Sequence, residues 1–170
     1  MLHKNSGTHY RSRRDILLNT DSLREVLKEI FGVDDKYLVP ISTNWFTPTV
    51  DTNDHIGTWI GYRMIDKKPL IRAYQSGVYM EKSIRVSFRL TFVGPHAEDL
   101  ANQVLLWDDR KDVVDAFAKY KAQLNYKDWT MFTYPVRNGG FNDGMCWIVD
   151  LSAQTFYEVD TKQMPWIPRA

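Results

Sequence analysis

The histidines are the first residues to consider as metal ligands or general bases. The chain has four, His3, His9, His55 and His96, and no two stand at the i, i+3 or i, i+4 spacing that brings imidazoles together on a helix. Residues 51–57 read Asp-Thr-Asn-Asp-His-Ile-Gly and partly match a calcium loop, but histidine occupies the fifth position and the glycine comes one place late. We therefore interpret this segment as a polar turn and expect no metal ligands.

Nucleophilic catalysis and phosphate binding have equally little support. Cys146 is the single cysteine, which excludes a disulfide framework within the chain and every multi-cysteine zinc or iron–sulfur site. It falls in an apolar run, so we expect a small core residue. The glycines of segment 139–144 are not followed by Gly-Lys-Ser/Thr, and no Gly-x-Ser-x-Gly elbow occurs. We expect no catalytic or cofactor-binding residues and predict that the protein is not an enzyme.

Binding is the chemistry that remains. Arg85 and Arg89 stand two pleats apart on the polar side of an alternating run, so their guanidinium groups point the same way and could hold a carboxylate or a phosphate. The alternative is an ordinary solvated face. Several aromatics fall on predicted loops and arms, where an isolated monomer has little use for them, which favours docking onto other copies or neighbouring proteins. These aromatics are Tyr10, Trp45, Phe46, Tyr74, Tyr79 and Trp166.

The elements that must position these residues begin with a helix. Apolar residues at helical spacing predict about three turns from Asp21 to near Phe31, with Asp21 or Thr20 as the cap and Gly32 as the left-handed end. Residues 40–55 read as a loop or a short edge strand. Two short strands, 58–65 and 70–74, are predicted around a polar turn at 66–69.

The clearest element is the strand 84–92, where apolar and polar residues alternate over nine positions. Gly94 ends it, and Pro95 suits the first position of a following helix. That helix is expected to bury one side and to end at 107–109, where Asp109 can cap a second helix. The apolar side of the first helix is formed by Ala97, Leu100, Ala101, Val104 and Leu105, and that of the second by Val113, Val114, Phe117 and Tyr120.

The last third favours a long hairpin, with strands 129–136 and 145–159 and a loop at 137–144. The resulting prediction is an α+β fold: a mainly antiparallel sheet with two to three helices packed on one face. No alternating βαβ series occurs, which argues against a doubly wound nucleotide-binding fold.

Length and composition fit a single core. The chain has 170 residues, 44% hydrophobic and 14% aromatic, with a net charge of +1, so bulk charge does not bind polyanions. Four basic residues against one acidic residue make segment 1–15 a basic arm, with Arg11, Arg13 and Arg14 among them. We divide the chain into a flexible arm (1–18), one domain (19–159) and an extended tail (160–170). No membrane span is predicted, and we expect a cytoplasmic site of synthesis.

Residues 85–101 carry a family resemblance. They read Arg-Val-Ser-Phe-Arg-Leu-Thr-Phe-Val-Gly-Pro-His-Ala-Glu-Asp-Leu-Ala. The run resembles neck and tail-completion proteins of the tail-terminator type from tailed bacteriophages, in which an alternating strand ends in aromatic-x-Gly-Pro-x-Ala and enters a helix with Leu-Ala. Residues 59–65 look like the family's earlier strand and residues 145–152 like its closing strand. The similarity covers about residues 56–157 and implies a tail-terminator-like fold.

The resemblance implies a structural virion protein without enzymatic activity. Family members form a ring, often of six copies, between the portal-connector assembly and the tail tube, so the implied partners are other copies, the tube, the connector and the sheath. Candidate interface or lumen residues are Arg11, Arg13, Arg14, Trp45, Phe46, Arg85, Arg89 and Trp166. If the basic arms faced the channel, their arginines could contact DNA phosphates without sequence preference.

The chain departs from the family in its aromatic loop at 44–48, its basic arm and its proline-bearing tail. These departures leave open whether it caps the tube, contacts a contractile sheath or joins connector to tube. Two other readings also stay open. One is a small nucleic-acid-binding module that uses arginines and aromatic stacking. The other is an enzyme whose site is assembled from distant segments.

Overall fold

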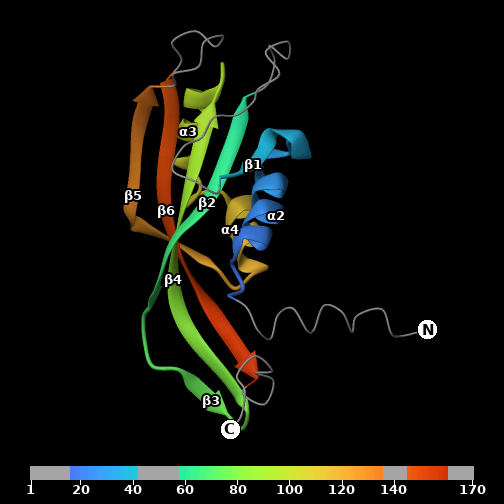
Figure 1. The fold of residues 1–170 in the computed structure, drawn as a ribbon, viewed down its shortest axis with the longest axis vertical. Helices are drawn as coiled ribbons and strands as arrows, with labels where there is room; N and C mark the ends of the chain where they lie inside the picture. The colour runs from blue at the N-terminus through green and yellow to red at the C-terminus, as the bar shows by residue number, and fades with distance from the viewer. Residues whose placement is uncertain (1–15, 42–57, 136–144, 161–170) are drawn as a thin grey trace, which may run out of the picture.

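A computed structural model gives the fold and describes residues 16–41, 58–135 and 145–160. Within these ranges six strands form one sheet in the order β1-β2-β4-β6-β5, and β3 pairs with β4 beyond the end of β2 (Figure 1). The elements are α2 (Thr20–Phe31), η1 (Asp35–Tyr37), β1 (Leu38–Pro40), β2 (Trp59–Pro69), β3 (Tyr74–Ser76), β4 (Tyr79–Val93), α3 (Ala97–Val104), α4 (Lys111–Ala118), β5 (Gln123–Pro135) and β6 (Met145–Asp160).

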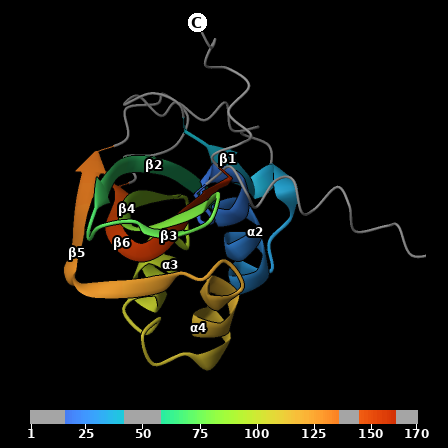
Figure 2. The ribbon, with the colours of Figure 1, turned by 90° about the horizontal axis from the view of Figure 1, so that it is seen from below.

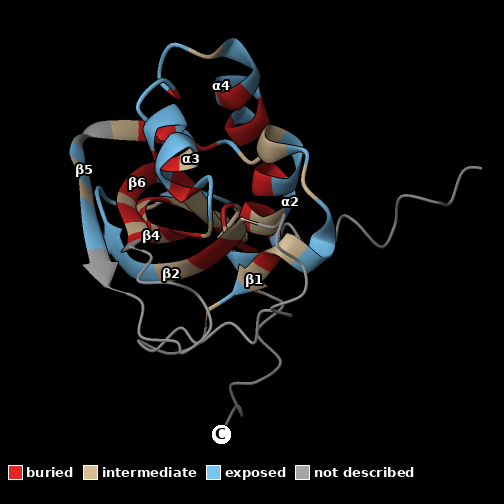
Figure 3. Cartoon of the chain, turned by 90° about the horizontal axis from the view of Figure 1, so that it is seen from above, coloured by how far each residue is buried: buried red, intermediate tan, exposed pale blue. Residues whose placement is uncertain are grey.

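All strand pairs in these ranges are antiparallel except β1 with β2. Three helices cover one face of the sheet, and exposed residues lie on the outer sides of these helices and along β5 (Figure 3). Nearly all residues from Ile65 to Gly77 are exposed as well. The predicted α+β class, with a mainly antiparallel sheet and helices packed on one face, is confirmed.

The central strand β4 sets the two faces of the sheet. Its side chains alternate as predicted, and the strand extends from Tyr79 to Val93 rather than only over 84–92. One face is buried under the helices and consists of Ile84, Val86, Phe88, Leu90 and Phe92. The opposite face carries Arg85, Ser87 and Arg89, and we call it the arginine face. Strand β6 pairs with β4 over fourteen residue pairs, so these two strands form the long central pair of the sheet.

Helix α2 matches its predicted length but not its predicted cap. Asn19 is the N-cap: the Ser22 N–H donates to Asn19 Oδ1 at 2.9 Å, and the Asn19 N–H donates to Ser22 Oγ at 2.7 Å. Thr20 and Asp21 already lie inside the helix, because the asparagine one residue earlier satisfies the orphan amides. Gly32 ends the helix with φ 60°, as predicted.

The polar turn predicted at residues 66–69 is wrong. Strand β2 continues through this segment to Pro69, and the register shifts between Met64 and Asp66, so that Ile65 is an extra residue at a bulge. Strand β1 pairs with β2 only at Ile60–Tyr62. Residues 66–69 of β2 therefore form an exposed edge of the sheet, where polar side chains are favourable. A proline is tolerated at such an edge since no partner strand needs its missing N–H.

The chain turns back further on than predicted. Residues 70–73 lie between strands, and β3 covers Tyr74–Ser76 rather than 70–74. Gly77, with φ 60°, and Val78 connect β3 to β4 in a tight hairpin, where Ser76 pairs with Tyr79. The strands β2, β3, β4 and β6 therefore extend past the helices and form the lower half of the molecule in Figure 1. We call this extension of the sheet the arm; it is distinct from the predicted basic arm at the N-terminus.

Pro95 lies in a turn before helix α3 rather than at its first position. The Ala97 N–H donates to the Gly94 carbonyl at 3.2 Å, which closes a turn with Pro95 in its second position, and the helix begins at Ala97. Leu105 lies beyond the end of α3 and is exposed, contrary to its predicted place on the apolar side. The next helix, α4, is preceded by Arg110 rather than capped by Asp109.

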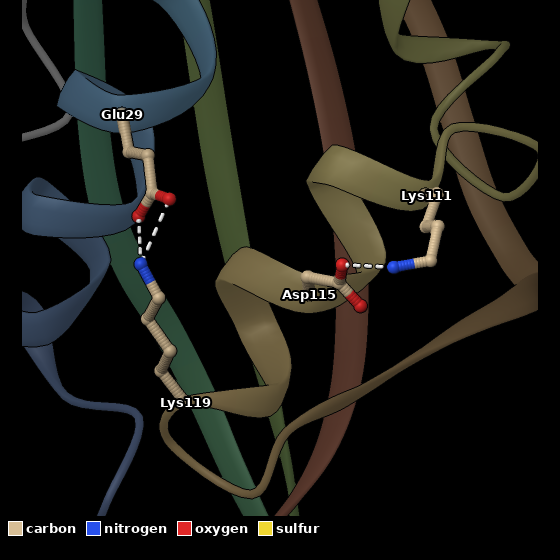
Figure 4. A network of polar contacts seen from close by, with 4 residues as sticks. All are labelled: Glu29, Lys111, Asp115 and Lys119. Atoms are coloured by element: carbon tan, nitrogen blue, oxygen red, sulfur yellow. Dashed lines mark hydrogen bonds and ion pairs between the residues drawn. The ribbon is translucent and has the colours of Figure 1, made fainter.

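Helix α4 packs against α2, and the two helices join aromatic residues into one core. Phe117 of α4 stacks on Phe88 of the sheet at a ring distance of 6.1 Å and contacts Trp107 at 5.9 Å. At the surface, Lys119 Nζ donates to both carboxylate oxygens of Glu29 at 2.8 Å, and Lys111 pairs with Asp115 along α4 (Figure 4). These ion pairs are exposed, so they stabilise the fold less than the buried ring contacts, which anchor α4 on the sheet.

The predicted long hairpin is present as β5 and β6, with two changes. Strand β5 begins at Gln123, six residues before the predicted start, and its register with β6 shifts between Asn125 and Thr130. The irregularity bends β5: residues 123–125 pair with β6 close to α4, and the strand pairs with β6 again from Thr130 (Figure 2). The predicted loop at 137–144 lies outside the described residues.

The folded domain begins before the predicted boundary at residue 19. Ile16 forms a bridge with Tyr157, and Leu18 is fully buried, so residues 16–18 belong to the core. The remaining part of the predicted basic arm, residues 1–15, lies outside the described residues. At the other end β6 runs to Asp160, the first residue of the predicted tail, and residues 161–170 are also outside.

Candidate interaction surfaces

Arg85 and Arg89 lie on one face, as predicted, but each is paired with a carboxylate of this chain. Arg89 donates through Nε and Nη2 to the two oxygens of Asp150 at 2.7 and 2.9 Å. Arg85 donates through Nη1 to Asp128 Oδ2 at 2.9 Å. The bidentate bond to Asp150 raises the pKa of Arg89, which keeps the guanidinium charged. Neither arginine is a free cation held ready for an external phosphate.

The rest of the arginine face is also internally bonded. Asn125 Nδ2 donates to the same Asp128 oxygen at 3.2 Å, and Gln154 Nε2 donates to Ser83 Oγ at 2.8 Å. The Arg89 guanidinium also lies over the ring of Phe132, 5.5 Å from its centroid. Arg85 and Arg89 are therefore held in place by polar partners of this chain, and a carboxylate balances the charge of each.

A second polar cluster lies on the arm, where β4 and β6 pair beside β3, and includes Lys121, which follows α4. Tyr79 Oη donates to Glu81 Oε2 at 2.8 Å, Glu81 lies opposite Glu158 in the β4-β6 register, and Lys121 Nζ contacts Glu158 Oε1 at 3.1 Å. Burial, and secondarily the bond to Glu81, raise the pKa of Tyr79, so the phenol stays a neutral donor. The sequence analysis missed this cluster because its members are far apart in the chain.

The arm exposes apolar side chains that the core does not cover. Ile65, at the β2 bulge, is 40% exposed and Leu70 41%, while Ile71 and Tyr74 are 66% and 65% exposed. We call these four residues the arm patch. Lys67, Lys68 and Arg72 lie among them, and none forms an ion pair with a described residue. The arm patch is thus apolar with a basic surround.

A second apolar surface lies at the corner between α3 and α4. Leu105 and Leu106 are 56% and 55% exposed, although Trp107 next to them is fully buried. Asp108 and Asp109 follow in the same turn, and neither is ion-paired within the described ranges. We call Leu105, Leu106, Asp108 and Asp109 the corner patch. It is apolar with an acidic surround.

The outer strands of the sheet leave main-chain groups without a strand partner. Strand β5 pairs with β6 along one side, and β1 pairs with β2 along one side. In the described part of the chain no strand pairs with the other side of either. An edge of this kind can accept a strand from another chain. The sheet edges therefore add to the surfaces available for assembly.

Several predicted site residues lie outside the described residues. These are Arg11, Arg13, Arg14, Trp45, Phe46 and Trp166, together with Tyr10 and the segment 51–57. Of the other aromatics, Tyr74 is exposed as expected, whereas Tyr79 is partly covered and bonded to Glu81. Cys146 is buried as predicted, and burial raises the pKa of its thiol to about 11.

The described residues contain no group of three or more histidines, cysteines or carboxylates placed to hold a metal ion. None of the helices in these ranges is long and apolar enough to cross a membrane. A scan against protein-family models found no family that matches the chain. A search of curated proteins likewise found no match.

Proposed function

We propose that this chain is a structural subunit of the neck of a tailed bacteriophage, which assembles with copies of itself into a ring that completes the tail and joins it to the head connector. The resemblance of residues 85–101 to tail-terminator proteins suggests the class. The observation that carries the proposal is the arm, which extends beyond the helices and exposes Ile71 and Tyr74 to about two thirds. Side chains of this kind are typical of a surface that another protein covers.

A ring needs two different complementary surfaces on each copy, because the same contact repeats around the axis. The arm patch and the corner patch are two such surfaces, and they differ in charge as well as in position. Additional partners are the tail tube, the connector and the sheath. If segment 1–15 faces the channel, Arg11, Arg13 and Arg14 contact DNA phosphates there without sequence preference.

Nucleic-acid binding as the main function has less support. Its two arginines on the central strand, Arg85 and Arg89, are bonded to Asp128 and Asp150, which already neutralise them. A phosphate would have to displace a carboxylate held at 2.7 to 2.9 Å. The arginine face is therefore better suited to contact a polar protein surface than to bind a polyanion.

The location of the protein in particles tests this proposal. Purified virions of the phage that encodes the chain would be analysed by peptide mass spectrometry and labelled with a gold-conjugated antibody against it. We expect its peptides in the particles and the label at the junction of head and tail. Absence from the particles, or label elsewhere on them, would overturn the proposal.

A further inference from the structure

The arm patch and the corner patch match each other in chemistry. Segment 65–74 reads Ile-Asp-Lys-Lys-Pro-Leu-Ile-Arg-Ala-Tyr and has three basic residues against one acidic residue. Segment 105–109 reads Leu-Leu-Trp-Asp-Asp and has two acidic residues and no basic one. Each segment exposes large aliphatic side chains beside its charges. Apolar contact flanked by opposite charges is what a specific protein interface needs.

The charges of the corner are not cancelled by the basic residues that follow it. Arg110 is bonded to Asp112 at 2.6 Å, and Lys111 is bonded to Asp115 at 2.8 Å. Asp108 and Asp109 therefore have no cationic partner among residues 16–41, 58–135 and 145–160. Glu98 and Asp99, exposed on the first turn of α3, add to the negative charge of these two aspartates.

The two patches of one copy do not cover each other. Both patches are exposed in a single copy, so neither covers the other. Most of the arm patch lies on residues 70–73 and β3, at the end of the sheet away from α3 (Figure 1). Covering both patches by the same contact thus requires a second copy. One copy would then present its arm to one neighbour and its corner to the other, a head-to-tail arrangement that closes into a ring when the rotation permits.

We infer that the arm patch of one copy docks on the corner patch of the next, with Ile71 and Tyr74 against Leu105 and Leu106, and with Lys68 and Arg72 facing Asp108 and Asp109. This inference rests on the proposed ring function and names the interface that forms the ring. The surface pair also sets polarity, because arm against arm would oppose two basic surrounds and corner against corner two acidic ones.

The test is a charge swap between copies. Variant A carries Lys68→Glu with Arg72→Glu, and variant B carries Asp108→Lys with Asp109→Lys. All four positions are exposed, so both variants should melt within a few degrees of the wild type. Alone, each variant opposes like charges in the contact, and we expect its subunit association to weaken about tenfold or more in sedimentation or light scattering.

An equimolar mixture of A and B is the decisive experiment. The acidic arm of A meets the basic corner of B, and the basic arm of B meets the acidic corner of A, so alternating copies should assemble about as well as the wild type. A chain with all four substitutions should also self-assemble and serves as the control for altered charge. Recovery in the mixture requires contact between different copies and supports the inference.

Two outcomes would overturn it while leaving the ring intact as a proposal. In one, the wild type assembles and both variants assemble equally well. In the other, the variants fail alone and the mixture stays dissociated, which would mean that the patches contact another segment of their own chain or a different protein. A wild-type chain that stays monomeric would instead contradict the proposed function itself.

Discussion

Arg89 and Asp150 face each other directly across β4 and β6 and are joined by two hydrogen bonds, at 2.7 and 2.9 Å. Sixty-one residues separate them in the chain. The pair lies next to the buried core, with 34% and 25% of the two side chains exposed. This bidentate contact forms when Arg89 and Asp150 lie opposite each other, so it favours the observed register of β4 and β6.

A double-mutant cycle should measure the strength of this pair. We expect Arg89→Ala and Asp150→Ala to couple by about 1–2 kcal/mol in urea unfolding, because the bond is bidentate and half-buried. The more exposed pair Lys119–Glu29 is the matched control and should couple much more weakly, because solvent screens its charges. Equal coupling in the two cycles would contradict the arrangement of the arginine face.

The core beneath β4 should be sensitive to truncation. Phe88 is fully buried and stacks on Phe117, so Phe88→Ala should lower the free energy of unfolding by about 3–5 kcal/mol. Phe132→Ala, on the exposed side of the sheet, should cost about 1 kcal/mol or less. Chemical denaturation of both variants would test the assignment of faces, which is wrong if the two lose equal stability.

Gly61 makes room for the side chain of Ile41, the residue that follows β1. A Cβ at this position would collide with Cδ1 of Ile41 and approach its Cγ1 to 3.0 Å. Gly61→Ala should therefore destabilise the fold by about 1–3 kcal/mol, measured by thermal unfolding. Adding Ile41→Val, which removes Cδ1, should recover part of the loss. A stable Gly61→Ala chain without the second change would show that β1 does not pack in this way.

The buried thiol of Cys146 gives a stability that depends on pH. Its pKa rises from an ordinary value of 9.0 to about 11, mainly because burial penalises the thiolate. The folded state thus binds the proton more tightly than the unfolded chain, and the stability that this provides is complete below about pH 9 and lost as the pH rises toward 11.

Two measurements check this behaviour. The native protein should react slowly with Ellman's reagent at pH 8 and rapidly once unfolded in urea. Between pH 9 and 11 the wild type should lose more stability than Cys146→Ala, which removes the titrating group while other residues titrate in both. Rapid native labelling at pH 8 would place Cys146 outside the core.

Elements with strong periodicity could be predicted from the sequence, because burial alone dictates their pattern. Strand β4 shows this, since its alternation follows from a core on one side and solvent on the other. Helix α2 and its Gly32 end were recognised for the same reason. The lower half of β2 was missed because both its faces are exposed there, so Asp66–Pro69 has the composition of a turn.

The partners of the arginines could not be predicted, because they depend on register. Asp128 reaches Arg85 only through the irregular part of β5, and Asp150 reaches Arg89 only through the exact alignment of β4 with β6. The one signal available was Asp150, an acidic residue inside an otherwise apolar run. The arm patch likewise gave no motif, since Ile65 and Ile71 resemble ordinary strand residues until their exposure is known.

Native mass spectrometry of the purified full chain tests the assembly claim most directly. If the protein is a ring subunit, the spectrum recorded at micromolar concentration should contain one closed species at an integral multiple of 20.0 kDa, with six copies expected. A single species at 20.0 kDa throughout that concentration range would contradict the account.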